Sequence, residues 1–185
     1  MRKATTANVR APSFKIHSLR ETVKILGDNE VRDAYKYLIS IGDVGTGEPY
    51  GYQHFERPKL RLEFDDITLD GKWEGSFRAT SEQVKLIIDF CQDIHHADRA
   101  LIHCFAGISR SAAAACILST IKMGSPRAAL DHVQRSKPSV YPNKWVLLLA
   151  DDHLKLDGAL ISAAFTVFPQ AVMDVFDGVR TRSRL

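Results

Sequence analysis

The chain has 185 residues, with 25 lysines and arginines, 22 aspartates and glutamates, and a formal net charge of +3. This length suits one domain with an extension, and a hydrophobic content of 45% is typical of a folded chain rather than a disordered one. The small positive charge is no argument for a nucleic-acid partner, and we expect none; it fits a small anionic ligand equally well.

The cysteine content and the apolar patterning exclude further classes of protein. The cysteines, Cys91, Cys104 and Cys116, are too widely spaced for a zinc ribbon, and they argue against a disulfide framework. No stretch approaches the 18 or so apolar residues of a membrane-spanning helix, and the basic N-terminus lacks the apolar core of a secretory signal. We therefore expect a cytoplasmic protein without a membrane partner.

Four short segments are predicted to form strands, because they combine β-branched, aromatic and alternating apolar residues. They are residues 14–19 (FKIHSL), 35–41 (YKYLISI), 60–64 (LRLEF) and 100–104 (ALIHC). The last is continuously apolar, which is typical of a buried central strand. Repeated glycines and prolines predict a loop over residues 42–58.

Helix signals lie between and after these strands. Ser18 and Asn143 each fit a helix cap, Thr80 and Gln83 fit a capping box, and Gly124 fits a helix end. The predicted helices cover residues 19–26, 80–96, 111–123, 126–136, 144–156 and 159–178, the last with a break at Pro169. Strands that alternate with helices predict an α/β fold with a mostly parallel central sheet flanked by helices.

Residues 103–111, HCFAGISRS, concentrate the chemistry of the chain at a strand–turn–helix junction. A short loop that enters a helix points its backbone N–H groups inward and binds an anion. Gly107 permits a positive φ and a close backbone approach, and Arg110 can fork onto two phosphate oxygens. The predicted phosphate-binding residues are Phe105, Ala106, Gly107, Ile108, Ser109 and Arg110.

Cys104 begins this loop, and the positive field around it favours the nucleophilic thiolate form. We expect Cys104 to attack phosphorus in line and form a cysteinyl-phosphate, which water then hydrolyses. This chemistry requires no cofactor and no metal. The only metal-like pair, His95 and His96, consists of adjacent helical residues that point about 100° apart, so we read it as a helix end.

The HCFAGISRS segment matches the HCxxGxxRS signature of cysteine-dependent protein tyrosine phosphatases. The chain most resembles the compact dual-specificity branch and related bacterial tyrosine phosphatases. The resemblance spans residues 14–155, with support from the alanine-rich helix after Arg110 and from Pro142-Asn143. It implies a three-layer, phosphatase-like architecture.

The resemblance also implies roles for individual residues. Cys104 would be the nucleophile and Arg110 the phosphate clamp. Ser111 would hydrogen-bond the Cys104 sulfur and assist breakdown of the intermediate, while His103 would help to hold Cys104 as a thiolate.

A general acid must protonate the leaving oxygen, and the family carries an aspartate for this after an earlier strand. The strand over residues 60–64 would deliver Asp65 and Asp66 to the sheet edge where Cys104 also lies. We favour Asp66, and Asp65 and Asp70 stay open as alternatives. The chain departs from the family here, because no WPD triplet is present and the distance from Asp66 to Cys104 is somewhat long.

We expect three domain segments: a flexible leader (1–13), a catalytic domain (14–157) that contains the region of resemblance, and a helical C-terminal extension with a basic tail (158–185). The expected activity is protein-tyrosine or dual-specificity phosphatase activity on a phosphotyrosine-containing protein or another phosphoester. The loop contains no lysine, which argues mildly against highly phosphorylated inositides.

Two other functions compete with this one. A sulfur-transfer or arsenate-reducing enzyme also uses a nucleophilic cysteine in a loop, but Cys116 lies about three helical turns beyond Cys104, too far for a resolving thiol. A non-catalytic phosphate-binding module is the other alternative, and Cys104, Arg110 and Ser111 together argue against it.

Structural roles are expected for several other polar groups. Cys91 and Cys116 have apolar neighbours and are read as small buried hydrophobes. Asp151 and Asp152 are read as a solvated helix face. Asn143 is read as a helix cap that lies near the phosphate loop.

Overall fold

The computed structural model describes residues 11–69 and 75–169. Its sheet has four strands in the order β1-β4-β2-β3, and every neighbouring pair is parallel. The strands are β1 (Ser13–Ser18), β2 (Tyr37–Gly42), β3 (Lys59–Glu63) and β4 (Arg99–Cys104). Each lies within two residues of its predicted segment.

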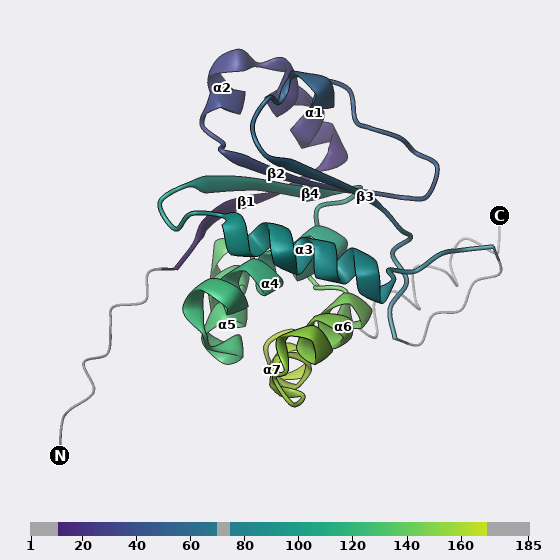
Figure 1. The fold of residues 1–185 in the computed structure, drawn as a ribbon, viewed down its shortest axis with the longest axis vertical. Helices are drawn as coiled ribbons and strands as arrows, with labels where there is room; N and C mark the ends of the chain where they lie inside the picture. The colour runs from purple at the N-terminus through teal and green to yellow at the C-terminus, as the bar shows by residue number, and fades with distance from the viewer. Residues whose placement is uncertain (1–10, 70–74, 170–185) are drawn as a thin grey trace.

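Helices cover both faces of this sheet, which gives the three layers seen in Figure 1. One face carries α1 (Leu19–Gly27), α2 (Asn29–Asp33) and the 3₁₀ turn η1 (Tyr52–His54). The other face carries α3 (Ser81–Asp93), α4 (Arg110–Met123), α5 (Pro126–Ser136), α6 (Lys144–Leu154) and α7 (Ala159–Val167). The predicted α/β class with a parallel sheet is therefore confirmed.

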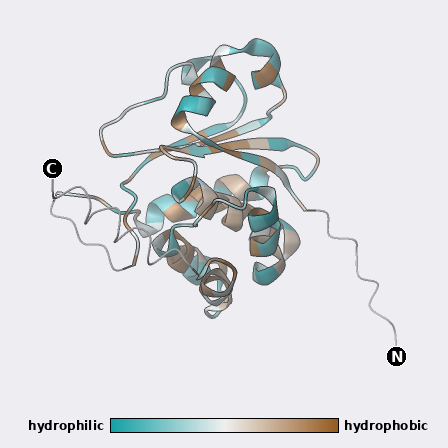
Figure 2. Cartoon of the chain, turned by 180° about the vertical axis from the view of Figure 1, so that it is seen from behind, coloured by the Kyte–Doolittle hydropathy of each residue, from teal (hydrophilic) through white to brown (hydrophobic). Residues whose placement is uncertain are grey.

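Alternate residues of β4 pack into the two hydrophobic clusters on opposite faces of the sheet. Leu101 joins a small cluster beneath α1, while Ala100, Ile102 and Cys104 join the main core with α3 and α4. Figure 2 shows hydrophobic segments in the sheet and in the helices packed against it. Burial on both faces explains why this strand reads as a continuous apolar run.

The helix boundaries follow the predicted capping signals. Ser18 and Thr80 each form a complete capping box, with Glu21 and Gln83 respectively. Gly124 ends α4 in the left-handed conformation at φ 65°. Asn143 caps α6 by accepting a hydrogen bond from the Val146 amide at 3.1 Å.

Asp151 corrects one sequence interpretation, because its side chain is only 3% exposed rather than solvated. The chain turns at Lys155 and Asp157, both with positive φ, and returns α7 toward α6. Gly158, Leu160 and Ile161 then donate their amides to the Asp151 carboxylate.

Other differences are smaller. The short elements α2 and η1 were not predicted, and α3 ends at Asp93 rather than at residue 96. The predicted helix beyond Pro169 and the basic tail lie outside the described residues. Leu160, Val167 and Phe168 of the α7 segment pack into the main core.

Candidate active site

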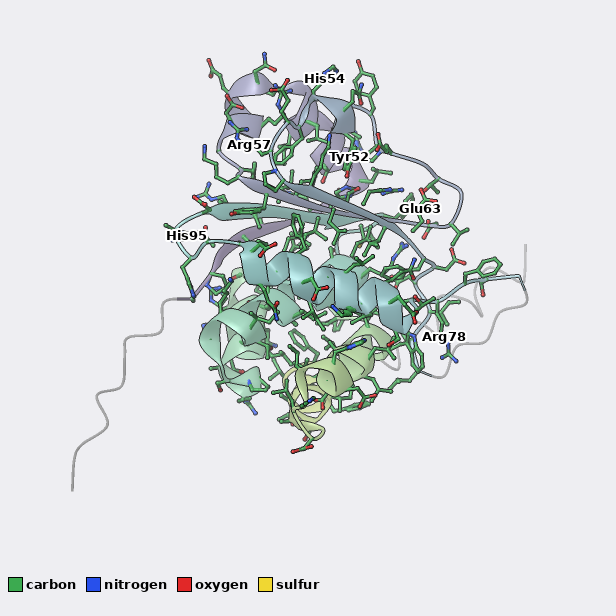
Figure 3. All side chains as sticks on the ribbon, in the orientation of Figure 1. Tyr52, His54, Arg57, Glu63, Arg78 and His95 are labelled. Atoms are coloured by element: carbon green, nitrogen blue, oxygen red, sulfur yellow. The ribbon has the colours of Figure 1, made fainter. Side chains whose placement is uncertain are left out.

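The carboxyl ends of all four parallel strands lie at one edge of the sheet. The strand β4 ends there at Cys104, between β1 and β2, and the 103–111 segment leads from it into α4. Figure 3 shows Glu63, the last residue of β3, at this edge, and His95, which precedes β4, at the opposite one. The segments that follow β1, β2 and β3 therefore surround the loop of residues 105–110, the predicted phosphate loop.

The carbonyl groups of this loop bond to neighbouring segments. Phe105 O accepts a hydrogen bond from the Leu19 amide at 3.0 Å, and Ile108 O accepts one from the Tyr141 amide at 3.0 Å. Ser109 O accepts one from the Asn143 amide at 3.2 Å. Within the described part of the chain, no oxygen accepts a hydrogen bond from the amides of residues 105–109. These amides are therefore available to an anion.

Gly107 is required by the packing of this loop. Its φ is +71°, and a Cβ built there would lie 2.5 Å from the carbonyl carbon of His17. Any side chain would therefore strain the backbone and push the loop away from β1.

Cys104 lies at the base of the loop and is 1% exposed. Its Sγ lies 3.1 Å from Ser111 Oγ, a hydrogen-bond contact at the start of α4. Cys91 and Cys116 are buried among apolar side chains, and burial raises the pKa of Cys91 to about 12 and also raises the pKa of Cys116. Of the three cysteines, only Cys104 faces a polar partner at the sheet edge.

Arg110, the first residue of α4, is 3% exposed. Its Nη1 donates a hydrogen bond to Phe64 O at 2.7 Å and forms an ion pair with Asp43 Oδ1 at 2.7 Å. Its Nε has no hydrogen-bond partner in the described residues and lies 3.8 Å from Asp66 Oδ2.

Of the two candidate acids that the structure describes, Asp66 is the one whose carboxylate contacts the predicted phosphate loop. Its Oδ1 accepts hydrogen bonds from Ser109 Oγ at 2.6 Å and from Asn143 Nδ2 at 2.8 Å. Asp65 instead accepts hydrogen bonds from the Phe77 amide at 2.8 Å and the Val44 amide at 3.4 Å. Asp70, the third alternative, lies outside the described residues.

His103 is buried on the face of the sheet that carries Leu101, opposite to the face of Cys104. Burial lowers the pKa of His103 to about 4, and the positive charge of Arg61 adds to this shift. The imidazole is therefore neutral at physiological pH, and its predicted support of the thiolate stays a prediction.

Asp43 was missed by the sequence analysis. It lies in a glycine-rich loop that the sequence marks only as irregular, far along the chain from Arg110. Its place directly after the β2 strand is the one signal that could have found it, because β2 ends beside Cys104.

The described residues contain no group of three or more histidine, cysteine, aspartate or glutamate side chains able to hold a metal ion. A hollow of about 770 Å³ lies between α1, α2 and η1, on the far face of the sheet from α4. Figure 3 shows His54 and Arg57, two of its lining residues, on that side. Its arginines are already engaged, since Arg57 pairs with Asp33 and Arg32 donates to Asn29.

None of the helices in residues 11–69 and 75–169 is long and apolar enough to cross a membrane. No protein-family model and no curated protein matches the sequence.

Solved structures do match the fold. The structure of human DUSP28 has a TM-score of 0.55 and 19% identity, and the match covers 80% of this chain and 93% of that one. Tk-PTP in its active form has a TM-score of 0.52 and 19% identity, with 77% and 90% of the two chains covered. PTPMT1, solved in complex with PI(5)P, has a TM-score of 0.53 and 16% identity, covering 82% of this chain and 93% of that chain. The chain therefore has the fold of dual-specificity and tyrosine phosphatases.

Proposed function

We propose that this chain, which has the fold of cysteine-dependent phosphatases, hydrolyses phosphomonoesters through a cysteinyl-phosphate intermediate. One observation carries the proposal: the Cys104 thiol lies beside Ser111 at a helix N-terminus whose loop amides have no acceptor within the described residues. A phosphate dianion is the ligand that such a loop, with Arg110 directly after it, binds best.

The first chemical step would break the bond between phosphorus and the leaving oxygen. The Cys104 thiolate attacks phosphorus, the S–P bond forms, and the leaving oxygen takes a proton from Asp66. Asp66 Oδ1 already accepts two hydrogen bonds, so Oδ2, which lies 3.8 Å from Arg110 Nε, is the oxygen that would deliver the proton.

The second step would release phosphate. Asp66, now ionised, accepts a proton from a water molecule, which attacks phosphorus and breaks the S–P bond. Ser111 Oγ, at 3.1 Å from Sγ, donates a hydrogen bond to the departing thiolate and so stabilises it. The products are inorganic phosphate and the restored thiolate.

The side chains around the loop favour an aromatic phosphoester. Phe105 is 65% exposed and Ile108 is also exposed, although both belong to the phosphate loop itself. These apolar groups suit the ring of phosphotyrosine better than a highly charged headgroup. The proposed substrate is therefore a phosphotyrosine-containing protein.

The test is hydrolysis of p-nitrophenyl phosphate in EDTA across pH 5 to 8, comparing the wild type with C104S and with C116S as a matched buried-cysteine control. Turnover by the wild type and C116S, with a loss of several orders of magnitude in C104S, is expected. Tungstate binding by C104S would show that the loop is still formed. Appreciable turnover by C104S would exclude Cys104 as the nucleophile.

The same preparation separates the competing functions. Binding of tungstate without turnover of any phosphoester would point to a phosphate-binding module. Thiol-dependent reduction of arsenate, or sulfur transfer from thiosulfate, would replace the phosphatase proposal.

A further inference from the structure

We propose that Asp43 is a positioning residue that fixes the orientation of the Arg110 guanidinium, so that its Nε edge faces the phosphate. This inference rests on the proposed function. It concerns a carboxylate outside the HCFAGISRS segment, on the loop that follows β2.

The contacts of Arg110 are distributed unevenly around its guanidinium. Two oxygens lie at Nη1, namely Phe64 O and Asp43 Oδ1, each at 2.7 Å. Nε has no hydrogen-bond partner in the described residues, although it is buried. The side chain is therefore held at one end and open along one edge.

This asymmetry determines where a phosphate can bind. A phosphate oxygen placed at Nη1 would lie against the Asp43 carboxylate, and two anions in contact repel each other. The edge formed by Nε and Nη2 can still make two parallel hydrogen bonds to phosphate. That edge also faces Asp66 Oδ2, 3.8 Å from Nε, so a phosphate bound there lies beside the proposed acid.

The position of Asp43 is itself well supported. Arg61, on β3, donates hydrogen bonds to Ser40 Oγ at 3.0 Å, Thr46 Oγ1 at 3.1 Å and the carbonyl of Gly47. Thr46 Oγ1 in turn donates to Asp43 O at 2.7 Å.

Two further features hold the same loop. Glu63, paired with Arg61 at 3.0 Å, accepts a hydrogen bond from the Gly45 amide at 3.0 Å. Gly42 leaves the space that the Arg61 guanidinium occupies, because a Cβ there would clash with it. These contacts hold the loop that carries Asp43 in a defined conformation, although the Asp43 side chain is 42% exposed.

The test compares D43A and D43E with the wild type, using p-nitrophenyl phosphate kinetics and tungstate affinity. Removal of the carboxylate takes away a negative charge beside Arg110 and also frees the guanidinium to turn. We expect D43A to lower kcat by about 10- to 100-fold, because the phosphate is held out of line with the nucleophile. Tungstate affinity should stay the same or increase, since the repulsion is gone.

Three controls separate this role from simple damage to the loop. D43E keeps the charge and should recover kcat to within a few-fold of the wild type. E48Q removes another negative charge from the same loop, where Glu48 is exposed, and should leave kcat unchanged. In an R110K background, D43A should lower kcat by less than twofold, because the Asp43 carboxylate acts by orienting Arg110.

The outcomes are distinguishable. An active wild type with D43A within twofold of it, or a D43A variant that loses kcat and tungstate affinity together, would overturn this inference alone. A full effect of D43A in the R110K background would also overturn it. A wild type with no turnover would overturn the proposed function, and this inference with it.

Discussion

Two helix N-termini in this molecule are used in opposite ways. At α7, the buried Asp151 carboxylate accepts hydrogen bonds from the amides of Gly158 and Leu160, each at 2.6 Å, and from the amide of Ile161 at 3.2 Å. At α4, the cap residue Ser109 makes no side-chain hydrogen bond to the helix, and its hydroxyl donates to Asp66 instead.

The difference shows how to separate a structural helix end from a functional one. The positive end of α7 is satisfied by a carboxylate of the chain itself, so it contributes to stability. Among the described residues, the loop amides that precede α4 have no such partner, and under the proposed function an anion from outside completes this end. Substitutions at the α4 end should therefore change the chemistry, and substitutions at the α7 end should change the free energy of unfolding.

The largest effect is expected at the α4 end, for D66N. Loss of the general acid should lower kcat by about 10²- to 10⁴-fold for phenyl phosphate, whose leaving group needs a proton. The loss should be smaller for p-nitrophenyl phosphate, and the melting temperature should change little because an asparagine Oδ1 can still accept both hydrogen bonds. Steady-state kinetics on the two esters measures this difference.

D65N is the matched control, because Asp65 adjoins Asp66 but binds the Phe77 and Val44 amides. Its effect should be small and independent of the leaving group. A leaving-group-dependent loss in D65N, with D66N near the wild type, would reassign the acid.

The next effect is expected at the α7 end, for D151A. This variant leaves three amides of the α7 N-terminus without their acceptor and should lower the free energy of unfolding by about 2–4 kcal/mol. Its kcat at 25 °C should equal that of the wild type. Urea denaturation of D151A beside D152A, which removes the exposed neighbouring carboxylate, checks this. Equal losses in the two variants would contradict the assigned cap.

The smallest effect concerns His103, beside the nucleophile. Its pKa is about 4 in the folded chain because of burial, against the ordinary value of 6.5. As the pH falls below 6.5, the unfolded chain binds a proton that the folded chain does not, so stability decreases. Between pH 6.5 and pH 5 this single group should lower the free energy of unfolding by about 1–2 kcal/mol.

The measurement is the free energy of unfolding from urea titrations at these two pH values, for the wild type and H103Q. The variant should lose that part of the pH dependence, whatever its own stability. An unchanged difference between the two pH values would show that His103 is not the group responsible.

The sequence was informative where the signal was local. Capping by Ser18, Thr80 and Asn143, the end of α4 at Gly124 and the strand–loop–helix at Cys104 all depend on neighbours a few residues apart. The carboxyl-edge rule for parallel strands also placed the Asp65-Asp66 pair at the correct end of the sheet.

The sequence was uninformative where contacts join distant segments. Asp43 meets Arg110, and Asn143 meets Asp66, only after four strands have taken their order in the sheet. Asp151 was misread because helical spacing alone does not reveal that the chain reverses at Lys155. The different hydrogen-bond partners of Asp65 and Asp66 likewise depend on the turn after β3, which local sequence does not specify.

The hydrogen bonds that Phe105, Ile108 and Ser109 accept through their carbonyl groups also have a consequence for protein synthesis. The donors are the amide of Leu19, which is translated early, and the amides of Tyr141 and Asn143, which are translated late. Contacts of such sequence separation close large loops of chain and cannot form before both partners exist. A chain emerging from the ribosome therefore carries Cys104 in an unformed loop until the start of α6 has been translated.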